Sequence, residues 1–463
     1  MTIAIVVVIL LGYLFIATEH MTHVNKAMIA IFCGTVGWVL FMCTGTDFIN
    51  AMHADEYFDF LNGMQHTVPL SKEFIAEHIF LRYVGQVGEL VLYLFATMSI
   101  VEVLTNNECF SFVEKVLRRR STAQMLWLTV LTTFMLSACI DNLTVTVLML
   151  MIMRKLVRNG KQRMYIGSAI VIAASCGGCW TVIGDISSLM VWGKGAVTAT
   201  NFSAALILPA IVATVIPTAM IQSKLPNHLD LDRPSYSFRG DDSPLVWWQK
   251  SLLLFFGIGG LWFVPSFHRI TLLPPFLGAL CCLGVVWVLN EIINKSRIRT
   301  EQPQSISLGR KLQYEVLQVM MYCVGVCLCV DVLVEIGAMR AAAGWLDNNI
   351  HNIYLASAFM GLLSSVLDNI ALVMAGINIY SVGEAVQEGY QSSFVQDGQY
   401  WHLIALCGNV GGCLLPIGSV AGFALMRAEG VCVWWYFRRI TLYAFLGLVA
   451  SVGTYFLVDY FLK

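Results

Sequence analysis

The stretch ASCGGCWTVIGDISS, residues 174–188, places two cysteines on either side of two glycines. A Cys-x-x-Cys spacing is typical of redox dithiols and also of metal clips. Asp185 follows six residues after Cys179, and apolar residues run on both sides of the stretch. Whether Cys176 and Cys179 carry electrons, hold a metal or only pack depends on the elements that position them.

The composition is that of a membrane protein. The chain has 463 residues, of which 58% are hydrophobic and 12% charged, with a mean hydropathy of +0.73. Soluble domains are nearer to about a quarter charged. Apolar runs recur along the whole chain, and each is about long enough to cross a bilayer core of ~30 Å. The first run has no Lys or Arg before Lys26 and is therefore expected to be a membrane helix, not a removable signal peptide.

Charge placement predicts the topology. Basic segments mark cytoplasmic loops, and two of them, residues 114–120 and 154–163, flank the apolar run 125–153 on both sides. As one helix this run would be roughly 43 Å long, which is too long for a bilayer without steep tilt. A re-entrant hairpin that turns at the polar residues 137–144 explains both basic flanks. The acidic loop 44–88 is expected to face outside.

Two blocks of the sequence recur in the same order. SACIDNLTVTVLML, residues 137–150, matches SSVLDNIALVMAGI, residues 364–377, at an offset of 227 residues. GGCWTVIGDISSLM, residues 177–190, matches GGCLLPIGSVAGFA, residues 411–424, at an offset of 234. Counting spans between the basic loops gives the second copy the opposite orientation. Inverted repeats with broken helices are the build of secondary transporters, whose site lies near the midplane between the repeats.

The predicted fold is an all-α polytopic membrane protein with two re-entrant hairpins and two broken transmembrane helices. Its expected parts are two N-terminal membrane helices with an external loop (1–88), a first inverted repeat (89–222, with hairpin 125–153 and broken helix 164–192), a cytoplasmic loop with two connecting helices (223–313), and a second inverted repeat (314–463, with hairpin 352–380 and broken helix 402–426).

The repeat argues against a dithiol. Cys176 aligns with Val410 in the second copy, whereas the glycine pair and the Ile-Gly step recur. Glycines interrupt a helix and expose backbone groups to a cavity. The stretch is therefore predicted to be an unwound helix. The helix-break glycines are expected to be Gly177, Gly178, Gly184, Gly411, Gly412 and Gly418.

Three carboxylates fall at the predicted breaks: Asp141, Asp185 and Asp368. A charged side chain at the bilayer centre costs roughly 2.5–3.5 kcal/mol, so we do not expect all three to be helix caps alone. Uncharged oxygen groups surround them in the sequence, and no Lys or Arg falls within the breaks. Hard cations take oxygen ligands, and three carboxylates would repel an anion. Desolvation brings the pKa of a carboxyl group toward neutrality, so that a proton and a sodium ion can compete for one site.

At these residues the sequence resembles the NhaD-type sodium/proton antiporters of bacteria, in the ion transporter superfamily. The motifs are LSACIDNLT (136–144), GGCWTVIGDISSLMVW (177–192), SSVLDNIALV (364–373) and GGCLLPIGSVAGFALM (411–426). The resemblance implies an antiporter with its ion site at the breaks. The predicted cation- and proton-binding residues, with Na+ or Li+ at the three carboxylates, are Asp141, Asn142, Asp185, Ser187, Ser188, Ser364, Asp368, Asn369, Asn409 and Ser419.

The expected function is export of Na+ or Li+ in exchange for protons by alternating access, in a bacterial inner membrane. Glu102 and Asp331, in the first helix of each repeat, are candidates for a proton path, against the alternative that each is a carboxylate near a membrane face. We expect no cofactor, no enzymatic activity and no nucleic-acid partner. The expected partners are membrane lipid and a second copy of the chain in a homodimer. Two other functions stay open: sodium-coupled symport of a small anion such as a dicarboxylate or oxyanion, and a membrane dithiol enzyme.

Overall fold

The chain is all-helical over the residues that the structure describes. These are residues 2–17, 24–45, 48–49, 52–62, 64–118, 121–227, 245–298, 306–350, 352–383 and 389–462 of the computed structural model. Residues 228–244 and 299–305 of the predicted cytoplasmic segments lie outside this part, as do Arg119 and Arg120. Within it, seven helices are long and apolar enough to cross a membrane. The polytopic all-α prediction is confirmed.

The N-terminal region contains two apolar helices and a helical extension. α1 (Thr2–Ala17) and α3 (Lys26–Thr44) are followed by the short α5 (Ala54–Leu61). α6 (Val68–Phe74), a π-helical turn (Ile75–Phe80) and α7 (Leu81–Asn106) then form one uninterrupted helix of 39 residues. This helix runs through positions 88 and 89, where the sequence suggests a boundary between the external loop and the first repeat.

Each of the four runs predicted to be a hairpin or a broken helix consists of two helices separated by a short non-helical break. In the first repeat the elements are α8 (Ser111–Leu117), α9 (Thr122–Ser137), α10 (Asn142–Leu156), α11 (Gly160–Cys179), α12 (Ile186–Gly193) and α13 (Ala199–Gln222). The second repeat contains α17 (Ile306–Glu335), α18 (Ala338–Asn349), α19 (Ile353–Ser364), α20 (Asn369–Ile379), α21 (Gln399–Gly411), α22 (Val420–Glu429), α23 (Val433–Arg439) and α24 (Thr441–Leu462). Between the repeats lie α14 (Trp247–Leu254), a π-helical turn (Phe255–Gly259), α15 (Gly260–Thr271) and α16 (Pro275–Ile298).

Equivalent helices of the two repeats make nearly the same packing contacts. α9 packs on α11 as α19 packs on α21, and α10 packs on α22 as α20 packs on α12. The corresponding last helices, α13 and α24, pack on each other, and so do the first helices, α7 and α17. Such reciprocal contacts are expected of two copies related by a two-fold axis.

Four glycines create the same close crossing in both repeats. A Cβ on Gly177 would overlap the backbone of Phe134 in α9, and one on Gly411 would overlap the backbone of Gly361 in α19. A Cβ on Gly178 would lie 2.8 Å from the carbonyl oxygen of Gly184, and one on Gly412 would lie 2.8 Å from that of Gly418. These are the positions that the sequence repeat singles out. Each hairpin therefore approaches its broken helix backbone to backbone.

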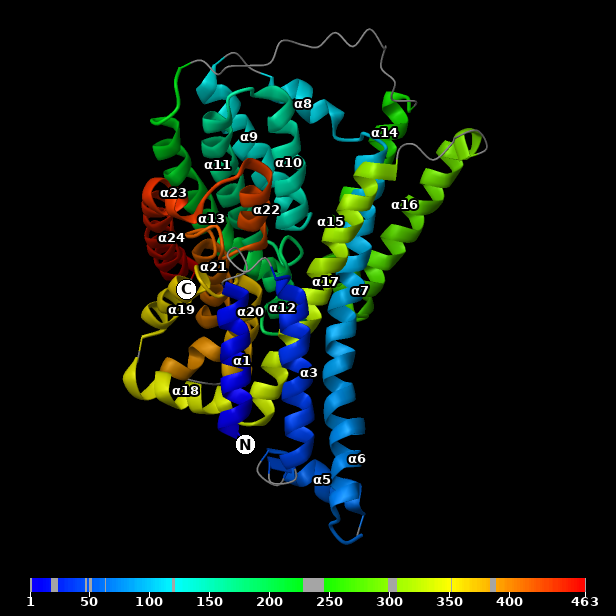
Figure 1. Ribbon diagram of the computed structural model, residues 1–463, viewed down its shortest axis with the longest axis vertical. Coiled ribbons are helices and arrows are strands. Elements are labelled where there is room, and N and C mark those ends of the chain that lie inside the picture. The colour runs from blue at the N-terminus through cyan, green and yellow to red at the C-terminus, as the bar shows by residue number, and fades with distance from the viewer. Residues whose placement is uncertain are drawn as a thin grey trace.

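The helices form two groups. The site bundle, defined here as α9–α13 and α19–α24, contains all four breaks. The flanking bundle consists of α1, α3, α7 and α14–α17, in which α3 packs along α17 and α16 packs along α7. Figure 1 shows α11, α13 and α24 on the left and α7 and α16 on the right. Contacts between the two bundles are few and run mainly from α17 to α20 and from α7 to α12.

His53, at the start of α5, links this short helix to α17. His53 Nε2 lies 3.0 Å from Glu335 Oε2, and Tyr83 donates a hydrogen bond of 2.6 Å to the same carboxylate. Glu56 lies 3.5 Å from His53 Nδ1, while the charge of Arg82 opposes protonation. The hydrogen bond to Glu335 is the largest of several effects, and together they raise the pKa of His53 above its usual 6.5.

This raised pKa predicts a pH-dependent attachment of α5. The stabilisation is fully present below the unfolded pKa of about 6.5 and is lost as the pH rises through the higher folded pKa. Protection factors for amide exchange in α5, corrected for intrinsic rates, are expected to fall as the pH rises above about 6.5. His53→Gln should remove the pH dependence, and His268→Gln, on α15, should keep it. A pH-dependent fall in protection that persists in His53→Gln would assign the effect to another group.

The crossing glycines predict a second result. Gly412→Ala should lower the thermal stability of the purified protein, because overpacking a tight contact costs about 1–3 kcal/mol. Gly85→Ala is the matched control: a Cβ added to this α7 glycine would meet nothing within 4 Å, and alanine there should be neutral or stabilising by about 0.5–1 kcal/mol. Equal melting temperatures for the two variants would mean that the crossing relaxes easily.

Candidate functional site

Each of the four helix breaks is followed by a helix that a polar side chain caps. Asp141 accepts hydrogen bonds from the amides of Leu143 (3.1 Å) and Thr144 (3.3 Å) at the start of α10. Asp368 accepts from the amide of Ile370 (3.1 Å) at the start of α20. The broken helices follow the same rule: Asp185 caps α12 and Ser419 caps α22, the latter through the amide of Gly422 at 3.1 Å. Capping satisfies amides that have no partner within the helix.

The two hairpins are held to their broken helices by equivalent hydrogen bonds. Ser137 donates to the carbonyl of Ala174 at 2.6 Å, and Ser364 donates to the carbonyl of Gly408 at 2.7 Å. Both serines are fully buried. The two donors, Ser137 and Ser364, are 227 residues apart, and the two acceptors, Ala174 and Gly408, are 234 residues apart. These are the offsets of the sequence repeat, so the repeat extends to individual side-chain contacts.

A chain of hydrogen bonds connects the two repeats at the breaks. Ser187 hydrogen-bonds to Asp185 Oδ2 and lies 2.8 Å from Asn409 Oδ1. Asn369 donates from Nδ2 to the same Asn409 oxygen at 2.9 Å. The chain thus runs from the first broken helix through the second to the second hairpin. It brings together four of the residues that the sequence predicts, and all four are buried.

The three carboxylates lie near one another but do not share one point. Asp141, Asp185 and Asp368 are between 3% and 6% exposed. Asp141 interacts electrostatically with Asp185, and Asp185 with Asp368. Within the described residues, no three acidic, histidine or cysteine side chains converge as the ligands of a single metal ion. Oδ1 of Asp141 and Nδ2 of Asn409 are buried without a hydrogen-bond partner in this part of the chain, so the cluster retains unused polar atoms.

The other predicted site residues also lie in the core. Asn142 opens α10 beside Asp141 and is 4% exposed. Ser188 of α12 is fully buried, and its hydroxyl lies 3.5 Å from the carbonyl oxygen of Gly178 in α11, across the break between these helices.

The structure corrects the expectation that no cation lies at the breaks. Lys26, the first residue of α3, places its Nζ 2.6 Å from Asp368 Oδ2. Its side chain is 11% exposed, and the rings of Tyr322 and Phe423 lie 4.2 Å and 4.8 Å from the ammonium group. The break segments themselves contain no Lys or Arg, whereas this lysine comes from α3 and lies 342 residues before Asp368 along the chain. Its sequence signal is weak: a single lysine that opens an apolar run.

The two cysteines of the opening stretch are free and fully buried on α11. Cys179 donates to the carbonyl of Cys176 at 3.1 Å, as a thiol within its own helix can. The break begins only after Cys179, because α11 ends there. Gly184 and Asp185 lie in the break, whereas both thiols and the glycine pair Gly177 and Gly178 still belong to α11, so the helix does not unwind at this pair as the sequence suggested.

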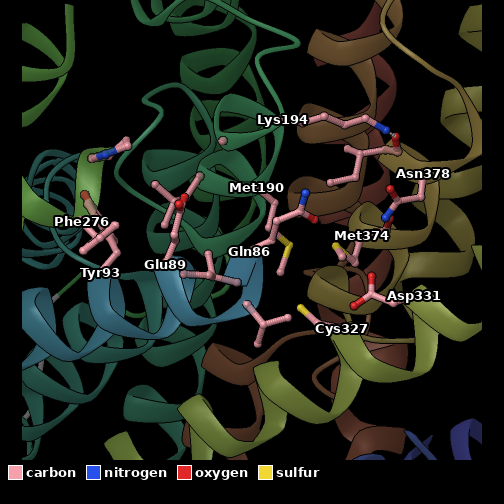
Figure 2. A pocket seen from close by; sticks show the side chains of 16 residues that line it. Gln86, Glu89, Tyr93, Met190, Lys194, Phe276, Cys327, Asp331, Met374 and Asn378 are labelled. Carbon is pink, nitrogen blue, oxygen red and sulfur yellow. Dashed lines mark hydrogen bonds between the residues drawn. The ribbon is translucent and has the colours of Figure 1, made fainter. Parts of the chain in front are cut away.

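A cavity of about 230 Å³ lies between the two bundles. α7, α16 and α17 contribute one wall, and α12 and α20 contribute the other. Figure 2 shows Gln86 and Glu89 on the α7 side and Asp331, Met374 and Asn378 across from them. Asp331 is 2% exposed, and its Oδ2 has no hydrogen-bond partner among the described residues. Glu102 is half-buried on α7 and does not line this cavity.

The hydrogen-bond chain predicts the effect of removing its central residue. Asn409→Ala removes the oxygen that accepts from Asn369 Nδ2, whereas Ser187 keeps Asp185 as an acceptor. An unsatisfied buried polar group costs about 1–3 kcal/mol. We expect a lower melting temperature in detergent and loss of any response of that temperature to NaCl. Asn349→Ala, on α18, is the control, since its side chain bonds to a nearby carbonyl, that of Trp345. An unchanged response in Asn409→Ala would exclude this residue from the site.

Comparison with known proteins agrees with this architecture. Residues 2–392 match the protein family described as citrate transporter. The chain is 34% identical over 375 residues to Sodium/proton antiporter 1 of Arabidopsis thaliana, covering 81% of this chain and 62% of that protein. It is 32% identical over 383 residues to Sodium/proton antiporter 2 of the same plant, covering 81% and 87%.

A bacterial relative is also named as a sodium/proton antiporter. The chain is 26% identical over 405 residues to the Na(+)/H(+) antiporter NhaD of Alkalimonas amylolytica, covering 82% of this chain and 79% of that protein. These relatives are transporters and not enzymes. They come from a plant as well as from bacteria, so the bacterial origin stays a prediction. The chain belongs to the citrate transporter family and is an NhaD-type member of the sodium/proton antiporters.

Proposed function

We propose that the protein exports Na+, and also Li+, in exchange for protons across a cytoplasmic membrane. The observation that carries the proposal is the buried cluster at the helix breaks, where three carboxylates meet uncharged oxygen groups from both repeats. Carboxylate, amide, hydroxyl and main-chain oxygens are the ligands of hard cations. The names of the relatives, sodium/proton antiporters in each case, support the same exchange.

The site residues divide the task in this proposal. The three carboxylates of Asp141, Asp185 and Asp368 each bind a proton or contribute oxygen to the cation. Neutral oxygens come from Asn142, Ser187, Ser188, Ser364, Asn369, Asn409 and Ser419. A carboxylate that accepts either ion, but not both, couples the two movements. The unused Oδ1 of Asp141 is the atom available for a proton or a cation.

The cavity between the bundles supports an access path. Gln86 and Glu89 lie near its α7 rim and Asp331 lies buried at its α17 wall. A buried carboxylate with an unused oxygen is suited to pass a proton inward, as the sequence suggests for Asp331. Glu102 remains a weaker candidate, because it does not reach this cavity. Alternating access would then consist of a change in the contact between the two bundles, which close and open opposite ends of the path.

Sodium-coupled symport of a small anion is the second candidate. The family description, citrate transporter, favours it, and so does the presence of a cation, Lys26, at the breaks. However, Lys26 is already paired with Asp368 at 2.6 Å, and the three carboxylates at the breaks leave the neighbourhood of the site acidic. The cation exchanger is therefore the better supported function.

The deciding experiment measures proton-gradient dissipation in everted vesicles from a host that lacks its own antiporters. NaCl, LiCl, KCl and a dicarboxylate are added in turn between about pH 6.5 and pH 9.5, the range in which carboxyl groups shifted by burial titrate. Na+ and Li+ should restore the fluorescence of a quenched pH probe. Asp141→Asn and Asp368→Asn should remove this response, because an amide cannot exchange a proton. Asp459→Asn, at the end of α24, serves as a matched control.

Either alternative has a distinct outcome. A dicarboxylate uptake that rises with Na+, without a proton response to Na+ alone, would favour the symporter. Full antiport by both Asp→Asn variants would overturn the assignment of the breaks as the ion site.

A further inference from the structure

We propose that Lys26 is a tethered counter-cation which occupies Asp368 in the sodium-free protein and must be displaced when sodium binds. The inference rests on the proposed function and deepens it by naming the competitor of the ion. It begins from one contact that crosses the boundary between the bundles: Lys26 belongs to α3 of the flanking bundle, and Asp368 to the second hairpin of the site bundle.

The contact is built as a specific site. The Nζ–Oδ2 distance is 2.6 Å, and both side chains are largely withdrawn from solvent, at 11% and 3% exposure. The rings of Tyr322 from α17 and Phe423 from α22 face the ammonium group, so that each bundle contributes an aromatic ring. An ammonium group over an aromatic face is attracted by the ring electrons. The lysine therefore rests in a place suited to a desolvated cation.

The rest of α3 holds the lysine there. Asn25 caps α3 by accepting from the amide of Ala27 at 2.9 Å. Gly34 of α3 and Gly325 of α17 allow the two helices to approach until a Cβ on Gly34 would be 2.8 Å from Leu328. Lys26 therefore extends from a fixed helix end and not from a flexible loop. Asp368, in turn, is fixed by its cap bond to the amide of Ile370.

The pair has a direct consequence for transport. A lone carboxylate buried at this depth would be strongly disfavoured, and Lys26 compensates its charge without any dissolved ion. A sodium ion that binds Asp368 delivers a second positive charge to the same oxygens. Electrostatic repulsion then separates the ammonium group from the carboxylate. Because the pair joins one bundle to the other, its separation also weakens the contact between them.

The test compares purified Lys26→Gln with wild type and with Lys161→Gln, an exposed lysine of α11. The readout is the NaCl concentration that gives half of the full rise in melting temperature, with choline chloride keeping the ionic strength constant. A ligand that binds only the folded state raises stability with its concentration relative to Kd, so loss of a competitor should lower the half-maximal concentration by roughly tenfold. The apparent KM for Na+ in vesicles should fall in parallel. Lys26→Arg, which keeps the charge, should not lower either value.

A double variant keeps the proposal testable if Lys26→Gln folds poorly. Removing one partner of a buried pair is more harmful than removing both. Lys26→Gln/Asp368→Asn should therefore melt at a higher temperature than either single variant, and a double variant less stable than both would overturn the pairing.

The outcomes separate the two claims. If wild type responds to Na+ and Lys26→Gln requires the same or a higher concentration, Lys26 is not a competitor and the proposal fails while the antiporter stands. If wild type shows no Na+ response in melting or in transport, the proposed function itself fails.

Discussion

The structure depends on one constraint: non-helical backbone deep in a bilayer must find hydrogen-bond partners within the protein. At the four breaks these partners are short polar side chains at helix starts, and at three of the four the side chain is an aspartate. The carboxylates that make the site suitable for a cation are therefore also the groups that allow the helices to be interrupted. Under the proposed function, replacing any of the three would affect both the helix breaks and the binding of the cation.

Both repeats meet this constraint with equivalent residues. The serine that ties each hairpin to its broken helix, and the glycines at each crossing, occur in both copies at the same offsets. What differs between the copies is the chemistry of the caps: the first broken helix has Asp185 where the second has Ser419. The negative charge is thus weighted toward the first repeat, and Lys26 compensates the carboxylate of the second. The two repeats therefore share one backbone frame and differ in the charge of their caps.

The sequence was sufficient to predict the apolar helices and the helix breaks that occur in both repeats. Hydropathy predicted the helices, the doubled Asp-Asn and Gly-Gly motifs predicted the breaks, and the break residues Asp185, Ser187, Asn369 and Asn409 do lie together. Lys26 could not be found in this way, because its contact with Asp368 depends on how α3 packs along α17, and no local pattern encodes that. The start of the helix Val68–Asn106 was also missed, since charged residues in its first turns resemble a loop by composition although the backbone continues as a helix.

The glycine crossings have a mechanical consequence. At these crossings two backbones are in contact with no side chain between them. Because no side-chain rotamer can change there, the hairpin and its broken helix are not expected to move relative to each other. Each pair behaves as one stiff block, and the repeat makes two such blocks linked by the chain of hydrogen bonds through Asn409. The movement that a transport cycle needs is therefore expected at the boundary with the flanking bundle. There the contact is made by side chains, a cavity and the buried Lys26–Asp368 pair instead of by backbone.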